Sequence, residues 1–465
     1  MSKRIFNCTA VAAMGALFAG CCKKEYTEQP NFIVLLADDM GYADLSCFES
    51  EKNVTPQLDR MAAEGMKFTS FYAAASVSSP SRAALMTGRY PKREGLHIGV
   101  FFPDSASGIG PAETTIASLL RSAGYTTACI GKWHLGHRPE HLPTSNGFDL
   151  FFGVPYSTDM DSHDSPEAMA AKVSVTNLDE TWRSSRNESW RQWDIPLIRN
   201  TTVIEQPVDL TGLTQRFTTE AISFIRKSRK HPFFLMLAYT TPHVPLFVSE
   251  SFYEPDVDSA YRQTIAEIDD SVGQVLEELR KTGLDKNTYV IFTSDNGPWL
   301  EKKHHGGSAH PFRAGKRTSY EGGHRVPCIA WSPHYIPANT VCDQLATLMD
   351  FVPTFTALAA APLPEDRVFD GKNIVALLSG ANDAQLPHDT FFYYASRGAI
   401  SGVRHENWKL KFENNQPELY NLSTDIGEQN NLAAVYPEKV NELKNAMLLF
   451  DRQLEENCKK ERYLQ

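Results

Sequence analysis

The 465-residue sequence has little cysteine and no excess of positive charge. Its eight cysteines are too few for a disulfide scaffold at this length, and no CxxC pair is present to indicate a structural zinc site. Lysine and arginine total 46 against 56 aspartates and glutamates, and the net charge of −10 argues against nonspecific binding to nucleic acid. Hydrophobic residues make up 42% and charged residues 22%, which excludes a disordered, collagenous or coiled-coil chain.

The N-terminus has no apolar run long enough to span a bilayer, because the run from Val11 to Phe18 is too short. Basic residues precede this run and small residues follow it, which predicts a signal peptide over residues 1–21. The sequence Phe-Ala-Gly-Cys is similar to a bacterial lipoprotein cleavage box and predicts a lipid anchor on Cys21. Cys22 offers a second register, and ordinary secretion is the alternative. We expect an exported protein, periplasmic or at the cell surface of a bacterium.

Short apolar runs alternate with amphipathic segments through the middle of the chain. The runs predicted to be strands are 32–36, 126–130, 233–239 and 289–293. The segments predicted to be helices are 55–64, 115–123, 213–229 and 261–281. Thr55 followed by Pro56 is typical of an N-cap and a first helical residue. This alternation predicts an α/β fold, with a mostly parallel sheet sandwiched by helices.

The pattern changes after about residue 380. Four short strand-like pieces separated by turns lie between 391 and 420, and a helix is predicted from 437 to 455. We expect a small C-terminal α+β subdomain with an antiparallel sheet over residues 381–465, after a large domain over 30–380. Residues 160–210 show no clear periodicity and are predicted to form a long surface insertion near the site.

Polar residues follow four of the predicted strands directly. They are Asp38 and Asp39, Lys132 and His134, His243, and Asp295 and Asn296. In an open α/β sheet, ligands bind outside the carboxyl ends of the strands, so these four loops are expected to converge on one crevice. The three aspartates of this set and Asn296 offer only oxygen ligands, which suit a hard cation such as Ca²⁺ or Mg²⁺.

The most specific motif runs from Ser78 to Arg89, with the sequence SSPSRAALMTGR. It resembles the signature of formylglycine-dependent sulfatases, which belong to the alkaline phosphatase superfamily, and the register places the modified residue at Ser78. Further stretches resemble motifs of the same family in the same order along nearly the whole exported chain. They are LADDMG at 36–41, GKWHLG at 131–136, TPH at 241–243, SDNG at 294–297, GK at 315–316, EGG at 321–323 and YNL at 420–422.

The resemblance implies an alkaline-phosphatase-like fold and a role for each matched residue. Ser78, converted to formylglycine, would be the nucleophile, because its hydrated aldehyde carries two hydroxyls, and an unmodified serine is a weak nucleophile. One calcium ion would be bound by Asp38, Asp39, Ser78, Asp295 and Asn296. The remaining roles implied are binding of the hydrate by Arg82, a base at His134, an acid at His243, and sulfate binding by Lys132 and Lys316. Arg89 is expected to support the turn that carries Ser78.

Serine in place of cysteine at position 78 resembles the serine-type sulfatases, which an anaerobic sulfatase-maturating enzyme activates. The stretch from Gly131 to Met160 resembles the arylsulfatase A and N-acetylgalactosamine-6-sulfatase branch, and this implies an exo-acting enzyme on sulfated galactose or N-acetylgalactosamine. Candidate residues for contact with the sugar are His97, Asp159, His163, Trp299 and Arg397.

Two other functions are compatible with parts of this pattern. A phosphomonoester or phosphonate ester hydrolase on the same scaffold would share the metal-binding carboxylates and could use unmodified Ser78. A lipid-anchored glycan-binding protein without catalysis would need a broken nucleophile or metal set, and every matched position is present in this sequence.

Overall fold

The computed structural model describes residues 29–160, 194–381 and 386–458. Within these ranges a ten-stranded mixed sheet has the order β11-β2-β10-β9-β1-β8-β4-β5-β6-β7. Its strands are β1 (Asn31–Ala37), β2 (Met66–Phe68), β4 (Thr126–Lys132), β5 (Leu150–Val154), β6 (Leu197–Arg199), β7 (Thr202–Glu205), β8 (Phe233–Ala238), β9 (Thr288–Ser294), β10 (Cys328–Trp331) and β11 (Thr340–Cys342). The four strands predicted from apolar runs lie next to one another at its centre, which confirms them.

The centre of the sheet is parallel and its margins are mixed. β1 pairs in parallel with β8 and β9, and β4 pairs in parallel with β8 and β5. Antiparallel pairs lie farther out, where β10 pairs with β9 and β2, and β6 pairs with β5 and β7. Every residue of β1, β8 and β9 is buried, as expected of strands covered on both faces. The mostly parallel sheet is thus confirmed.

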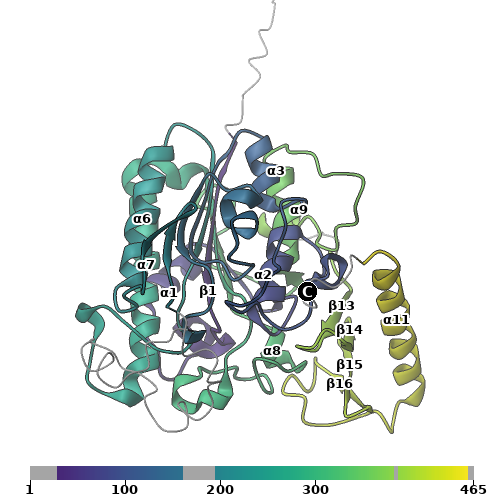
Figure 1. Ribbon diagram of the computed structural model, residues 1–465. Helices are drawn as coiled ribbons and strands as arrows, with labels where there is room; N and C mark the ends of the chain where they lie inside the picture. The colour runs from purple at the N-terminus through teal and green to yellow at the C-terminus, as the bar shows by residue number, and fades with distance from the viewer. Residues whose placement is uncertain (1–28, 161–193, 382–385, 459–465) are drawn as a thin grey trace, which may run out of the picture.

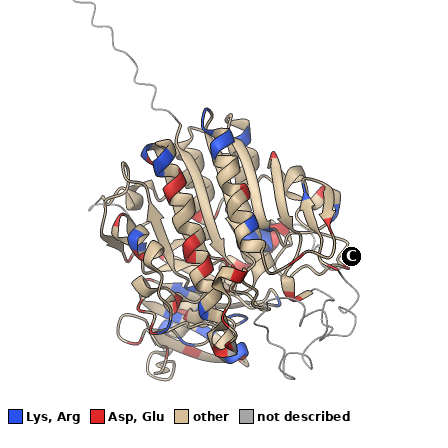
Figure 2. Ribbon diagram, turned by 90° about the vertical axis from the view of Figure 1, so that its left-hand side faces the viewer, with Lys and Arg blue, Asp and Glu red and all other residues tan. Residues whose placement is uncertain are grey.

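Helices cover both faces of this sheet (Figure 1). Ile33 and Leu35 of β1 pack in a core shared with α1 (Pro56–Ala63), α6 (Leu213–Ser228) and α7 (Ala260–Thr282). Phe32 and Val34 point to the opposite face, where the core includes α2 (Ser78–Thr87), α3 (Ile116–Ser122), α9 (Phe351–Leu358) and α10 (Val375–Leu378). Alternate side chains of one strand therefore enter two separate cores. Figure 2 shows charges of both signs along the outer helices and gathered at the end of the molecule opposite the start of β1.

Helix α1 begins at Pro56, as predicted, but the group that caps it differs from the prediction. The hydroxyl of Thr55 does not cap the helix; it accepts a hydrogen bond from the backbone N–H of Ser46 instead. The carboxylate of Asp269, on α7, accepts hydrogen bonds from the backbone N–H groups of Gln57 and Leu58, at 3.1 and 2.8 Å. The cap of α1 is therefore supplied from a distant helix, which no local pattern indicates.

The C-terminal part forms its own antiparallel sheet of β13 (Thr390–Tyr394), β14 (Ile400–His405), β15 (Trp408–Glu413) and β16 (Gln416–Asn421). Helix α11 (Pro437–Glu456) packs on this sheet through Val440, Leu443 and Met447. In Figure 1 both lie beside the large domain, next to α8 (Glu321–His324). The predicted α+β subdomain is confirmed, and its exact boundary stays a prediction. Two further short strands, β3 (Phe71–Tyr72) and β12 (Ala346–Thr347), pair with each other.

The predicted irregular insertion at 160–210 is wrong in part, because β6 and β7 extend the main sheet at its edge. Residues 161–193 of this stretch, including His163, lie outside the described residues, as do the predicted signal peptide and Cys21. None of the helices in the described ranges has the length and apolar character needed to cross a membrane. No disulfide links any two of the five cysteines in these ranges.

Candidate active site

Three carboxylates from two neighbouring strands form the centre of the site. Asp38 and Asp39 follow β1, and Asp295 follows β9, whose Ser294 is paired with Ala37 in the sheet. One oxygen from each of the three carboxylates lies within 4.8 Å of the others, and all three residues are buried. The parallel register therefore brings together side chains that are about 250 positions apart in the sequence.

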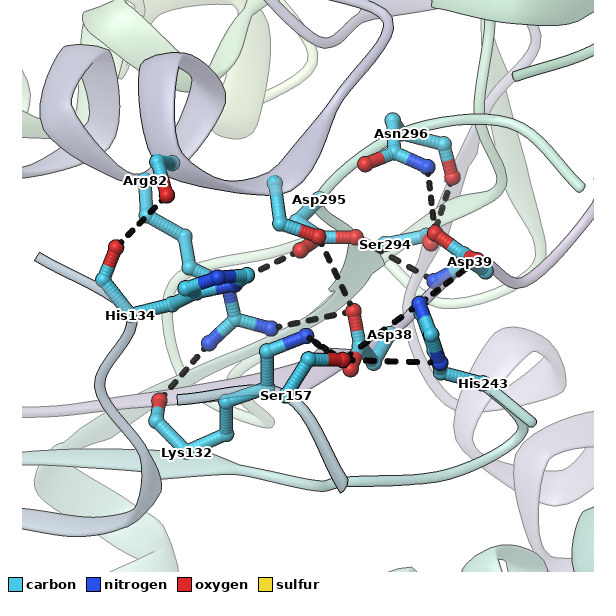
Figure 3. Close-up of polar contacts among 12 residues, drawn as sticks. Asp38, Asp39, Arg82, Lys132, His134, Ser157, His243, Ser294, Asp295 and Asn296 are labelled. Atoms are coloured by element: carbon cyan, nitrogen blue, oxygen red, sulfur yellow. Dashed lines mark hydrogen bonds and ion pairs between the residues drawn. The ribbon is translucent and has the colours of Figure 1, made fainter. Parts of the chain in front are cut away.

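Asn296 completes an oxygen-rich group beside these carboxylates (Figure 3). Its Nδ2 donates to Asp39 Oδ1 at 2.7 Å, whereas its buried Oδ1 accepts no hydrogen bond from the described residues. Asp39 has a left-handed backbone with φ of 65°, and its N–H donates to Asp295 Oδ1 at 3.2 Å. A buried carbonyl oxygen without a donor, next to three carboxylates, fits a hard divalent cation.

Ser78 is the first residue of α2, and its hydroxyl lies directly against this acidic group. Its Oγ donates to Asp38 Oδ1 at 3.2 Å, and the side chain is buried. The positive end of the α2 dipole favours negative charge at this position. The next residue supports the turn, because Ser79 Oγ donates to the carbonyl of His134 at 2.8 Å and accepts from the N–H of Phe101.

Three cationic side chains surround the carboxylates. Arg82, one turn after Ser78 on α2, donates through Nε to Asp295 Oδ2 at 2.8 Å and through Nη1 to the carbonyl of Lys132 at 2.7 Å. Lys132 Nζ lies 2.5 Å from Asp38 Oδ2, and Lys316 Nζ lies 2.6 Å from Asp39 Oδ2. These three positive charges match the three carboxylates of Asp38, Asp39 and Asp295 in number.

The pKa values show how strongly these groups act on one another. Burial alone would raise the pKa of Asp38, but the charges of Lys132, His243 and Arg82 more than offset it and lower the pKa below the usual value. Burial lowers the pKa of Lys132, and the attraction of Asp38 offsets this only in part. Asp38 is therefore ionised at neutral pH.

His134 follows β4 and is held as a neutral imidazole. Burial, and then the charges of Lys132 and Arg82, lower the pKa of His134 well below its ordinary value of 6.5. Its Nε2 contacts the carbonyl of Phe101 at 3.1 Å, and its backbone is left-handed, with φ of 61°. A backbone in this sparsely populated region at a polar site is typical of a functional constraint. The neutral ring can accept a proton, as a base must.

His243 lies on the other side of the carboxylates. Its Nδ1 contacts the carbonyl of Val244 at 2.5 Å and so carries the hydrogen, while Nε2 lies 3.5 Å from Asp39 Oδ2. The hydroxyl of Ser157 lies between Lys132 Nζ, at 3.1 Å, and His243 Nε2, at 3.4 Å. Sequence reasoning missed Ser157; its place beside Asp159 was the only signal.

The structure brings together all the predicted catalytic and metal-binding residues: Asp38, Asp39, Ser78, Arg82, Lys132, His134, His243, Asp295, Asn296 and Lys316. Arg89, predicted to support the turn at Ser78, instead forms an ion pair with Glu94. It follows Gly88, which ends α2 in a left-handed conformation, so Arg89 and Ser78 lie at opposite ends of a ten-residue helix.

Two of the five candidate sugar-contact residues lie at this site. The positive charges of His243, Lys316 and Lys132 more than offset burial and lower the pKa of Asp159, and Trp299 packs 5.6 Å from the His243 ring, between centroids. Gly398, which follows Arg397 in the β13–β14 turn, packs against His97, so these two candidates come from segments that are in contact.

Comparisons with known proteins agree with this geometry. A family model described as Sulfatase matches residues 30–361, and one described as N-sulphoglucosamine sulphohydrolase, C-terminal, matches residues 311–457. Arylsulfatase G of Mus musculus is 40% identical over 404 residues, which cover 83% of this chain and 76% of that protein. N-acetylgalactosamine-6-sulfatase of Mus musculus is 39% identical over 396 residues, which cover 83% and 71%.

Solved structures show the same likeness. Ps i-CgsB in complex with k-i-k-neocarrahexaose superposes with a TM-score of 0.79 at 30% identity, covering 91% of this chain and 93% of that one. The PsFucS1 sulfatase from Pseudoalteromonas sp. gives a TM-score of 0.78 at 26% identity, covering 94% and 91%. With the acidic group, the serine at the start of α2 and the surrounding cations in place, the chain belongs to the sulfatase family and is a sulfuric ester hydrolase.

Proposed function

We propose that this enzyme is an exo-acting glycan sulfatase that removes sulfate from galactose or N-acetylgalactosamine units. The likeness to N-acetylgalactosamine-6-sulfatase, and to a solved structure that holds a neocarrahexaose, supports a sulfated carbohydrate as the substrate. A phosphonate monoester hydrolase of Agrobacterium radiobacter shares the fold at 20% identity and a TM-score of 0.64, and this likeness is of fold alone.

One observation carries the proposal: Ser78 Oγ lies 3.2 Å from Asp38 Oδ1, in a group of three carboxylates surrounded by Arg82, Lys132 and Lys316. A nucleophile, an oxygen-rich group of cation ligands and paired positive charges are the parts needed to bind a tetrahedral anion and transfer it. This combination of groups favours a negatively charged ester of a strong oxyacid, rather than an uncharged ester, as the substrate.

Ser78 would act after oxidation to formylglycine. Conversion of the CH₂OH group to an aldehyde removes two electrons and two protons, which an anaerobic sulfatase-maturating enzyme would accept. The hydrated aldehyde supplies one hydroxyl that displaces the sugar oxygen from sulfur and a second that expels sulfate and restores the aldehyde. Arg82 is placed to hold this side chain, because its guanidinium lies one turn away on the same helix.

Asp38, Asp39, Asp295 and Asn296, with the side chain at position 78, would hold one Ca²⁺. The ligand set fits, because it consists of oxygen atoms and includes the donor-free Oδ1 of Asn296. The cation would supply Lewis-acid stabilisation of charge on the sulfate oxygens. Lys132 and Lys316, each ion-paired with one of the carboxylates, would bind the remaining sulfate oxygens.

The two histidines would divide the proton transfers. His134 is neutral because of its buried, cationic surroundings, and would take the proton of the hydroxyl that expels sulfate. His243 carries its hydrogen on Nδ1 in the contact with Val244, so Nε2 is the nitrogen that faces Asp39 and the reaction centre. Once protonated there, it would donate that proton to the leaving sugar oxygen.

The N-terminal sequence supports an exported enzyme, periplasmic or at the bacterial surface, with a possible lipid anchor on Cys21. An enzyme in that location meets polymeric glycans of a host. Radiolabelled palmitate incorporation in the wild type and its loss in Cys21→Ser would test the anchor.

The decisive experiment for the activity is a desulfation screen with the full chain, co-expressed with the maturating enzyme and supplied with calcium. Regio-defined monosulfates of galactose, N-acetylgalactosamine and N-acetylglucosamine would be compared with the corresponding phosphates. Release of sulfate from a galactose-type sugar by the wild type, and not by Ser78→Ala, is the expected result. Preferential release of phosphate, unaffected by maturation, would instead identify the phosphoester hydrolase.

A further inference from the structure

Trp299 touches two of the proposed catalytic groups at once. Its ring centroid lies 5.6 Å from that of His243 and 4.5 Å from Nζ of Lys316. Lys316 Nζ is at the same time 2.6 Å from Asp39 Oδ2, so it lies between a carboxylate and an indole ring. The indole thus contacts two groups that both approach Asp39 Oδ2, although it is neither a metal ligand nor a nucleophile.

The backbone around Trp299 is fixed against the segment that carries Lys316. The N–H of Lys316 donates to the carbonyl of Pro298 at 2.9 Å. A Cβ at Gly315 would lie 2.3 Å from that carbonyl, and a Cβ at Gly306 would lie 2.3 Å from the carbonyl of Trp299. Only glycine allows the chains to approach this closely at both points, so Trp299 and Lys316 are held in one register.

The ring itself is also oriented by polar contacts. Nε1 donates to Glu301 Oε2 at 3.0 Å, in a hydrogen bond at the exposed edge of the indole. Nζ of Lys302 and Cζ of Arg317 lie 4.5 and 4.6 Å from the ring centroid. Together with Lys316, three cationic side chains therefore contact the same indole ring. Attraction of a cation to a tryptophan face is stronger at a desolvated site, and the Lys316 side chain is only 6% exposed.

We propose that Trp299 is a positioning residue: it holds His243 where a proton reaches the leaving sugar oxygen, and it holds Lys316 on the sulfate. This inference rests on the proposed function, because it assumes that His243 is the general acid. In that step the sulfur–oxygen bond breaks, the electron pair stays on the sugar oxygen, and that oxygen receives the proton from His243 Nε2.

The proposal predicts a dependence on the leaving group. A sugar alcohol is a poor leaving group and needs the proton, whereas a more acidic alcohol needs it less. Replacing Trp299 by leucine should therefore slow the enzyme most on the least acidic leaving alcohol. Loss of sugar contact alone would not produce this dependence.

The test compares Trp299→Leu, Trp299→Phe and wild type, all matured and calcium-loaded. The substrates are the sugar sulfate identified by the screen and the same sugar carrying fluorine beside the sulfated carbon, which makes the leaving alcohol more acidic. We expect Trp299→Leu to lower kcat about tenfold on the parent sugar with little change in KM, and clearly less on the fluorinated sugar. Trp299→Phe keeps an aromatic face and should recover most of kcat.

Trp408→Leu is the matched control, because Trp408 is also partly buried but lies on β15 against Tyr436. This variant should leave the ratio of the kcat values on the two substrates unchanged. Thermal unfolding of each variant reports whether it folds. An equal loss of kcat on both substrates, or a change confined to KM, would overturn the role of Trp299 in positioning His243. Absence of sulfatase activity in the wild type would instead overturn the proposed function.

Discussion

Two buried ionic clusters lie close together in this enzyme, and they are built differently. The active-site cluster has three carboxylates and three cations around Ser78. The second, here called the Glu321 cluster, joins α8 to the C-terminal sheet. Its members are Tyr72, Glu321, Tyr393, Arg404, Lys409 and Glu428. The two touch through the backbone, because the N–H of Gly297 donates to the carbonyl of Gly323 at 3.1 Å.

The Glu321 cluster satisfies its central charge from every side. Glu321 Oε1 accepts from Tyr393 at 2.6 Å and from Lys409 at 2.9 Å, and Oε2 accepts from Tyr72. Burial would raise the pKa of Glu321, but Lys409 and the neighbouring arginines lower it far below the usual value. The side chains of Lys409 and Glu321 are both fully buried. Such a closed network has no place for a substrate.

The active-site cluster keeps polar atoms unpaired. Within the described residues, Asn296 Oδ1 and His134 Nδ1 are buried and have no hydrogen-bond partner. Asp39 and His134 also have left-handed backbones, an arrangement that costs free energy. The comparison shows that burial of charge does not by itself mark a site. Glu428 of the Glu321 cluster also has a left-handed backbone, with φ of 52°, and a buried Oε1 without a hydrogen bond among the described residues, so these features occur in both clusters. The active-site cluster differs in its three adjacent carboxylates and in the hydroxyl of Ser78 that lies against them.

The largest effect is expected from the nucleophile. Ser78→Ala should lower turnover more than about a thousandfold, because no other side chain replaces the one that attacks sulfur. Its free energy of unfolding should change by less than about 1 kcal/mol, since a single hydrogen bond to Asp38 is lost. Sulfate release and urea unfolding measure the two quantities. Retained turnover would contradict the assignment of Ser78.

The Glu321 cluster should respond in the opposite way. Lys409→Met leaves Glu321 and Glu428 buried without their shared cation and should lower the free energy of unfolding by about 3–5 kcal/mol. Folded enzyme should keep most of its kcat. Lys439→Met removes an exposed pair with Glu442 and should cost less than about 1 kcal/mol. A kcat loss in Lys409→Met as large as that of Ser78→Ala would break the distinction between the clusters.

The two clusters also differ in how many of their residues could be predicted from the sequence. The active-site residues lie in contiguous motifs at the carboxyl ends of strands, so Asp38 and Ser78 were both predictable. Ser157 was not, because a single serine in a loop has no pattern of its own. No long-range partner of Glu321 was predicted, since a buried pair between α8 and β15 leaves no local signal.

The fold shows the same limit. Long apolar runs predicted β1 and β8, whereas the short edge strands β6 and β7 were missed, because three or four residues carry no periodicity. Thr55 and Pro56 predicted the start of α1 but not its cap, which comes from Asp269 on another helix. Local chemistry therefore predicts where elements begin, and tertiary contacts decide which groups satisfy their ends.

Removal of divalent cations should affect the active-site cluster and not the Glu321 cluster. The expected effect is smaller than the effects of the substitutions above. A chelator should lower activity and melting temperature together, because a ligand that binds only the folded state stabilises it, by about 2.7 kcal/mol at a hundredfold excess over Kd. Added Ca²⁺ should restore both. Chelation should lower the free energy of unfolding of Lys409→Met by the same amount as that of the wild type. The reason is that the cation of the Glu321 cluster is a lysine side chain, which a chelator does not remove. Activity and melting temperature that ignore the chelator would remove the metal from the proposal.

A third buried carboxylate shows what burial does without a cation. Asp44 accepts hydrogen bonds from Tyr261, Gly41 and Ser308, at 2.6, 2.7 and 2.8 Å, and no ion pair to it is formed among the described residues. Burial raises the pKa of Asp44 to about 7, and these hydrogen bonds offset the rise only in part. Asp38 and Glu321, equally buried, have lowered pKa values because lysine and arginine surround them.

This contrast predicts the sign of a pH effect. Between pH 5 and 6 the folded protein keeps the proton on Asp44 that the unfolded chain has lost, so Asp44 contributes a fall in stability of about 1.4 kcal/mol per pH unit as pH rises. Asp44→Asn should remove this fall from the pH dependence of unfolding, whereas Asp343→Asn, at an exposed position, should retain it. Urea unfolding at a series of pH values measures the slopes. Equal slopes in the wild type and Asp44→Asn would mean that hydrogen bonds alone can hold a buried carboxylate ionised. In that case the cations of the two clusters would not be the reason that Asp38 and Glu321 are charged.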